Sequence, residues 1–215
     1  MRALFSPDSR LMRVMSRVGD LMVLNLLFLL TCVPVVTIGA ASSSLYTVCF
    51  RFGTDREGSL IRTYFAAFRE DFRRSTLLWL AALVCGAAAC VNTYVLYLLP
   101  GALRWGSVLF AILFVLALLI SSYLFPLCSQ FGGSVWETAR NALILSLGYL
   151  PRSVLMVALN VLPFALMLFD FYRFLQLGFV WAALYFSAAA YANTFLLKKI
   201  FAPYLQETSE KEVHP

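Results

Sequence analysis

Long uncharged apolar stretches constrain what this chain can fold into. The first runs from Leu21 to Phe50, between the charges of Asp20 and Arg51. Four later stretches are Thr76 to Leu99, Gly106 to Cys128, Ser153 to Phe169 and Leu175 to Leu197. A membrane-crossing helix needs about 20 mostly apolar residues. The charged fraction, 13% of 215 residues, is roughly half that of a soluble domain. The sequence therefore predicts an all-α, polytopic helical membrane protein.

The basic residues indicate how often the first stretch crosses. If residues 21 to 52 cross once, the arginines before residue 20 and those from Arg51 to Arg74 fall on opposite sides. If they cross twice, 15 of the 17 basic residues fall on one side. Basic residues concentrate in cytoplasmic loops, so we expect a hairpin with both termini cytoplasmic. A cleaved leader ending near Gly39 is the alternative, and it would leave residues 51 to 74 outside.

The hairpin has two short arms. Pro34 and Gly39 flank Thr37, where a helix can break and turn. Leu21 to Val36 and Ile38 to Phe52 each reach only ~23 Å at about 1.5 Å per residue. Two full spans and a re-entrant pair covered by protein both fit this length. We expect about six membrane segments in a single integral membrane domain, residues 1–205, followed by a polar tail, residues 206–215.

A repeated pattern suggests an internal duplication. Cys49 to Gly53 and Cys128 to Gly132 both read C-x-x-F-G. A semi-polar stretch follows each copy, and each stretch ends in Arg-Ser, at Arg74 and at Arg152. The pattern predicts two parallel copies of a helix, a cytoplasmic interfacial helix and a span.

The first semi-polar stretch, Leu60 to Arg74, has an aromatic face and a basic face. Its basic residues are Arg62, Arg69, Arg73 and Arg74. Such a helix commonly lies among the headgroups of an anionic leaflet. We expect it to anchor the fold there, with binding of a partner's cytoplasmic domain as the alternative.

Residues suited to catalysis or metal binding are scarce. The only histidine is His214, and the five cysteines form no C-x-x-C pair. Serine–histidine catalysis and histidine metal sites therefore lack their components. We expect no enzymatic activity, no cofactor and no metal site.

Polar residues in membrane segments are the places to look for function. The candidate polar site lies at the cytoplasmic mouth of the hairpin and comprises Asp20, Asn25, Ser42, Ser43 and Ser44. The amides of Asn92, Asn160, Gln176 and Asn193 are expected to form interhelical hydrogen bonds. Asp170 and Arg173, three residues apart, are expected to pair with each other or with water.

Two segments carry a family resemblance. NLLFLLTCVPVVTIGAASSSLYTV (Asn25 to Val48) and YFAAFREDFRRSTLLWL (Tyr64 to Leu80) resemble the YesL-like family of bacterial membrane proteins. The resemblance implies a Gram-positive plasma-membrane protein, often encoded near ATP-driven sugar-uptake transporters. It supplies no agreed activity and no catalytic residues.

The sequence thus favours a non-catalytic accessory or assembly partner of an ATP-driven carbohydrate uptake system. A small transporter in its own right is the first alternative, and a membrane enzyme is the last. The expected partners are anionic lipid headgroups, with either a transport-system permease or a second copy of the chain. No nucleic-acid partner is expected.

Overall fold

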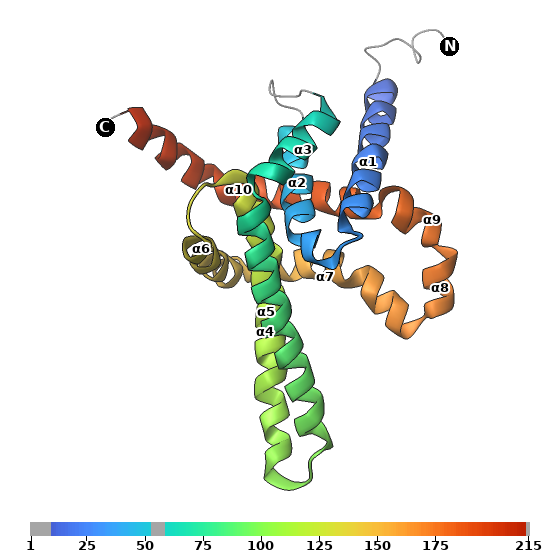
Figure 1. The fold of residues 1–215 in the computed structure, drawn as a ribbon, viewed down its shortest axis with the longest axis vertical. Helices are drawn as coiled ribbons and strands as arrows, with labels where there is room; N and C mark the ends of the chain where they lie inside the picture. Colours follow the sequence, from blue (N-terminus) through green and yellow to red (C-terminus); the bar gives the residue numbers. More distant parts are fainter. Residues whose placement is uncertain (1–9, 53–58, 214–215) are drawn as a thin grey trace.

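The structure is a computed structural model that describes residues 10–52 and 59–213, and it is built of helices without a β-strand in those ranges. In order, the elements are α1 (Arg10–Cys32), η2 (Val35–Thr37), α2 (Ile38–Arg51), α3 (Leu60–Glu70), α4 (Phe72–Leu98), η3 (Gly101–Trp105), α5 (Gly106–Gln130), α6 (Val135–Gly148), α7 (Leu150–Phe169), α8 (Phe171–Gln176), α9 (Gly178–Val180), η4 (Trp181–Tyr185) and α10 (Phe186–Val213). Figure 1 shows their arrangement. The all-α prediction is confirmed.

Helices of membrane-crossing length account for most of the chain. Among the described residues, five segments are long and apolar enough to cross: Val14–Cys32, Phe72–Leu98, Leu103–Gln130, Leu150–Phe169 and Gly178–Ala202. Many large apolar side chains on them are exposed. An exposed apolar surface of this extent is stable in contact with lipid chains rather than with water. The chain is a multi-pass membrane protein.

The helix α2, the second arm of the predicted hairpin, is short and enclosed by protein. Its 14 residues span about 21 Å, less than the roughly 30 Å hydrocarbon core. Eleven of them are buried, and α1, α3, α4, α5 and α10 all contact this helix. The two arms therefore differ, because α1 exposes apolar side chains while α2 is covered. Protein cover is the condition under which a short segment is stable at membrane depth.

Side-chain hydrogen bonds close the turn between α1 and α2. Thr37 Oγ1 donates to the carbonyl oxygen of Thr31 at 2.6 Å. Trp79 Nε1, from α4, donates to the carbonyl oxygen of Val35 at 2.8 Å. These bonds pair carbonyl groups that a break in the helix leaves without helical partners. The turn predicted at Pro34 is therefore present.

Gly39 allows α2 to approach α4 closely. A Cβ atom at this position would collide with the carbonyl oxygen of Ser75 and would lie 2.6 Å from Cβ of Trp79. Small residues permit such close approach between membrane helices. Gly39 lies inside α2 rather than in the turn, so its role is in packing.

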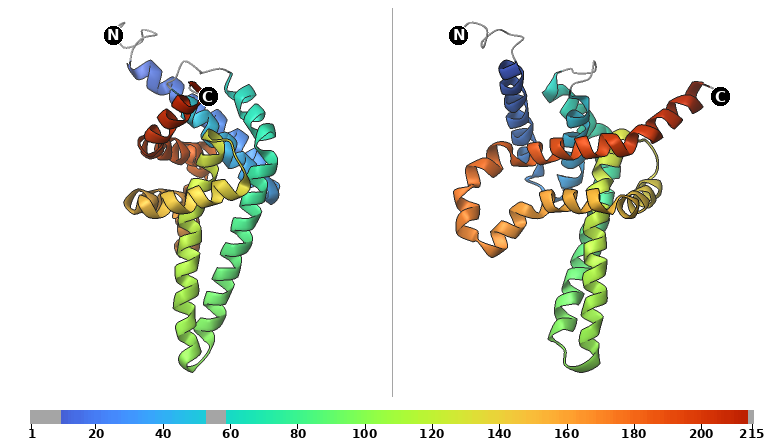
Figure 2. Two further views of the ribbon diagram at one scale, coloured as in Figure 1. Left: turned by 90° about the vertical axis from the view of Figure 1, so that its left-hand side faces the viewer. Right: turned by 180° about the vertical axis from the view of Figure 1, so that it is seen from behind.

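The helices α4 and α5 form a long antiparallel hairpin that projects from the rest of the molecule (Figure 1). The hairpin turns at Gly101, which has a φ of 77°, a left-handed conformation that glycine adopts readily. The start of α1 and the end of α2 lie at the opposite end of the molecule from this turn (Figures 1 and 2).

The helices α7 and α10 run across the α4–α5 hairpin near its open end (Figure 2). The predicted duplication agrees only in part with the order of elements: in α3–α4 and in α6–α7 a shorter helix precedes a long one, but α2 has 14 residues whereas α5 has 25. The arrangement differs between the copies, since α4 lies along α5 whereas α7 turns away. The helix α10 also continues past residue 205, where the membrane domain was predicted to end, to Val213.

Candidate functional site

A break at Asp71 separates the predicted basic helix into two parts. Residues 60 to 70 form α3, and α4 begins at Phe72. Arg62, Arg69 and Arg73 are exposed on the surface. The Arg74 side chain is only 15% exposed. Its assignment to the basic interfacial face was wrong, because it belongs to the first turn of α4 and its side chain reaches α5.

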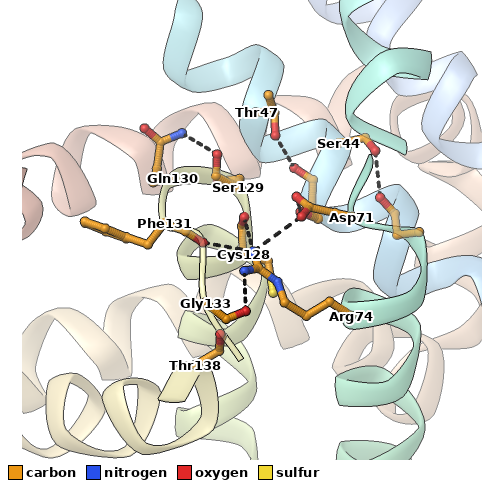
Figure 3. A network of polar contacts seen from close by, with 12 residues as sticks. Ser44, Thr47, Asp71, Arg74, Cys128, Ser129, Gln130, Phe131, Gly133 and Thr138 are labelled. Carbon is orange, nitrogen blue, oxygen red and sulfur yellow. Dashed lines mark hydrogen bonds and ion pairs between the residues drawn. The ribbon is translucent and has the colours of Figure 1, made fainter. Parts of the chain in front are cut away.

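Arg74 binds the end of α5 (Figure 3). Its Nη2 donates to the carbonyl oxygens of Cys128, at 2.5 Å, and Phe131, at 2.9 Å, and its Nη1 donates to that of Gly133 at 3.2 Å. The last carbonyl groups of a helix have no helical donors and carry partial negative charge. A guanidinium, with five N–H donors, is suited to several of them at once.

Asp71 connects this arginine to α2. Its Oδ1 lies 3.3 Å from Arg74 Nη2, and its Oδ2 accepts a hydrogen bond from Ser43 Oγ at 3.0 Å. Burial raises the pKa of the Asp71 carboxyl, while Arg74 and the Ser43 hydrogen bond oppose that rise. We call Ser43, Asp71, Arg74 and the carbonyl groups of Cys128, Phe131 and Gly133 the Asp71–Arg74 clasp. It joins α2, the start of α4 and the end of α5.

A polar cleft of about 250 Å³ adjoins the clasp. Residues of both charges and several hydroxyl and amide groups line it, including Thr47, Arg51, Thr63, Glu70 and Gln130. It lies at the end of α5, beside α3 and the start of α4. Chemically it offers hydrogen bonding and ion pairing.

The five residues of the predicted polar site at the hairpin mouth do not form one site, because their side chains contact different partners. Asp20 lies 4.0 Å from Arg17 on its own helix, and Ser44 Oγ donates to Ala40 within α2. Ser42 lines an apolar cleft. Of the five residues, Ser43 is the one that joins the clasp. Successive residues of a helix point in directions about 100° apart, so the three consecutive serines face different elements.

Asn25, the remaining residue of that site, holds α1 against the π-helical turn η4. Its Nδ2 donates to the carbonyl oxygens of Trp181, at 3.1 Å, and Ala182, at 2.6 Å. Its Oδ1 accepts from the backbone N–H of Ser187 at 3.0 Å. A π-helical turn shifts the backbone hydrogen-bonding pattern, and Asn25 bonds to the groups affected. Its amide thus connects α1 to the last apolar segment.

A second polar cluster lies between α2, α7 and α10. Asn193 Nδ2 donates to Tyr46 Oη at 3.1 Å and to Asn160 Oδ1 at 3.2 Å. The interhelical role predicted for Asn160 and Asn193 is therefore confirmed. Asn92 instead donates to the carbonyl oxygen of Ala88 in its own helix.

The ion pair predicted between Asp170 and Arg173 is also present, with Arg173 Nε 2.9 Å from Asp170 Oδ2. Sequence reasoning did not identify Asp71 or Tyr46. The signal for Asp71 was a pair of adjacent carboxylates, Glu70 and Asp71, inside a stretch rich in arginine.

Part of the chain that includes the clasp residues Ser43, Asp71 and Arg74 matches a known family. The family model described as "Protein of unknown function, DUF624" matches residues 21–93. Residues 21–93 are thus similar to the DUF624 family. The match agrees with the resemblance to YesL-like proteins. Comparisons with curated proteins and with solved structures gave no match.

The DUF624 segment includes one side of the clasp. It covers α1 from Leu21, all of α2 and α3, and α4 as far as Thr93. Ser43, Asp71 and Arg74 lie inside it, whereas the α5 carbonyl groups that Arg74 binds lie outside. The clasp therefore joins the DUF624 segment to the rest of the membrane domain.

Proposed function

We propose that the protein is a non-catalytic accessory or assembly partner of an ATP-driven carbohydrate uptake system in the plasma membrane of Gram-positive bacteria. The link to carbohydrate uptake rests on the YesL-like resemblance. The observation that carries the accessory role is the projecting α4–α5 hairpin. Val84, Val91 and Ile112 on its two helices are 66%, 60% and 60% exposed, so the hairpin offers a long apolar surface to the helices of a permease.

The polar contacts support a non-enzymatic role. The clasp groups bind helix ends and backbone carbonyl groups, and Asn25 bonds to the backbone of η4 and α10. These are interactions that fix helices relative to one another. A scaffold that presents a rigid hairpin depends on such interactions.

We also propose that both termini are cytoplasmic and that α3 faces anionic lipid. The distribution of 15 of 17 basic residues supports this orientation. Arg62, Arg69 and Arg73 are exposed at the end of the molecule away from the α4–α5 turn. Their charges would then meet the anionic headgroups of the inner leaflet.

Co-purification of the tagged full-length protein from native membranes in mild detergent tests the accessory role. We expect a permease subunit to be recovered in stoichiometric amount. Val84→Trp and Val91→Trp should reduce that recovery at least several-fold. Val154→Trp, at an exposed position on α7, is the matched control and should leave it unchanged. Recovery of the chain only as a homo-oligomer would contradict the proposal and favour a transporter in its own right.

A further inference from the structure

An open apolar cleft of about 340 Å³ lies among α1, α2, α4, α5, α7 and α10. Its walls are formed largely by apolar and aromatic side chains, such as Phe28, Leu118, Phe125 and Val161. The described residues that line it include no charged side chain. This volume falls in the range of small-molecule sites, about 300–1,000 Å³. Since the surrounding helices include candidate membrane spans, a molecule that partitions into lipid would have access to the cleft.

Uncharged polar side chains also line the cleft, among them Tyr46, Asn160, Ser42, Ser121 and Ser122. Asn193, which is fully buried, donates to Tyr46 and to Asn160. Its Oδ1 is a buried acceptor without a hydrogen-bond partner among the residues that the structure describes. Such an acceptor in an apolar environment carries a desolvation cost. Asn193 Oδ1 is thus an acceptor that the present arrangement of the described residues leaves without a donor.

A hydroxyl group has the chemistry that suits these side chains. It donates one hydrogen bond and accepts others, so it can bond to the Tyr46 hydroxyl and to the Asn160 amide, which line the cleft. Asn160 is only partly buried, lines the cleft and accepts a hydrogen bond from Asn193. A hydroxyl group in the cleft can therefore bond to Tyr46 and Asn160 and so join the hydrogen-bonded cluster.

We propose that this cleft binds a neutral glyceride lipid of the monoacylglycerol class. The acyl chain occupies the apolar part of the cleft, and the glycerol hydroxyl groups meet the Tyr46–Asn160–Asn193 cluster. A charged amphiphile fits poorly, because a buried ion needs a partner of opposite charge. A plain hydrocarbon makes no hydrogen bond to Tyr46 or Asn160. This site lies apart from the outer α4–α5 surface on which the accessory role rests.

Competition photolabelling of the full-length protein in phosphatidylcholine vesicles tests the site. The probe is a monooleoylglycerol whose acyl chain carries a diazirine, and labelled peptides are mapped by mass spectrometry. We expect label on α7 and α10 near Val161 and Ala189. Unlabelled monooleoylglycerol should compete at concentrations at least about 5-fold lower than octadecene does. A factor of about 5 in affinity corresponds to the net contribution of about one hydrogen bond. Oleate should compete less well than monooleoylglycerol at neutral pH.

Two variants separate the cleft from the general lipid surface. Val161→Trp fills the cleft and should abolish the site-specific label, whereas Val154→Trp on the same helix should retain it. Asn160→Leu should remove most of the preference for monooleoylglycerol over octadecene. Equal competition by the three molecules on the unmodified protein would overturn the proposal. Label spread evenly over the exposed faces of α4 and α5 would overturn it as well. Neither result depends on the folding of a variant.

Discussion

Arg74 Nη2 donates a hydrogen bond to the carbonyl oxygen of Phe131 at 2.9 Å, across 57 positions of sequence. This contact and its neighbours connect the first turn of α4 to the end of α5 and, through Asp71, to Ser43 of α2. The open end of the α4–α5 hairpin, opposite the turn at Gly101, is thus fixed to the buried helix α2. The clasp should contribute strongly to stability, because its members are largely shielded from solvent.

Replacement of Arg74 by Ala should lower the free energy of unfolding by about 2–4 kcal/mol. The change removes several charge-assisted hydrogen bonds and leaves the Asp71 carboxylate without its cation. Chemical denaturation in detergent micelles measures the effect. Arg73→Ala, at the exposed neighbouring position, is the control and should change stability by less than about 0.5 kcal/mol. Equal losses in the two variants would show that the clasp does not stabilise the fold.

Asp71 should make the stability of the clasp depend on pH. Burial raises its pKa above the ordinary value of 3.8, so the folded state binds this proton more tightly than the unfolded state does. The resulting contribution is fully present below pH 3.8 and is lost as the pH rises through the folded-state pKa. The Asn side chain in Asp71→Asn does not titrate. Both proteins are denatured at pH values from about 3 to about 7. As the pH rises, the free energy of unfolding of the wild type should fall relative to that of the Asp71→Asn variant. If the wild type instead gains stability relative to the variant as the pH rises, Arg74 and Ser43 lower the Asp71 pKa by more than burial raises it.

Gly39→Ala should destabilise the protein by about 2 kcal/mol or more, since the added Cβ meets the backbone of Ser75 and forces α2 away from α4. Gly86→Ala is the matched control, because position 86 is also helical and has open space around it. There the loss of backbone freedom in the unfolded state should raise stability by up to about 1 kcal/mol. Thermal unfolding in micelles distinguishes the two. A neutral Gly39→Ala would argue against a close α2–α4 contact.

The exposed arginines of the α3–α4 segment should respond to lipid charge. Changing Arg62, Arg69 and Arg73 to Glu should weaken attraction to anionic lipid by roughly 1 kcal/mol for each basic residue lost. The test compares the stability of wild type and triple variant in vesicles with and without phosphatidylglycerol. The difference between them should appear mainly in the anionic vesicles. The same difference in both compositions would indicate that protein contacts, rather than lipid, hold this segment.

Cysteine labelling should place the two ends of the α4–α5 hairpin on opposite sides of the membrane. In a background with the five native cysteines replaced by Ala, Gly132→Cys should react only with reagents that reach the cytoplasm. Leu103→Cys, near the turn, should react from outside. Thr54→Cys tests the return of the first hairpin and should behave as Gly132→Cys does, although position 54 lies outside the described residues. External labelling at Thr54 would contradict the cytoplasmic placement of the basic segment.

Features that depend on local composition could be predicted from the sequence. Apolar length identified the membrane helices, Pro34 marked the turn after α1, and the three-residue spacing of Asp170 and Arg173 indicated their ion pair. These properties follow from residues that are near one another in the chain, so no knowledge of packing was needed.

The tertiary structure decided which side chains meet across long sequence separations. Because the helix breaks at Asp71, Arg74 belongs to α4 and its side chain reaches the end of α5. The residue assigned to the lipid interface is therefore at the centre of the clasp. The apolar pattern of α2 is compatible with both a lipid-exposed arm and a covered helix, and only its neighbours distinguish them. The Ser42–Ser44 run is split among different partners because a helix points successive residues about 100° apart. The pairing of Tyr46, Asn160 and Asn193 likewise required three helices to pack together, since hydrogen bonds between distant segments depend on distance and orientation rather than on composition.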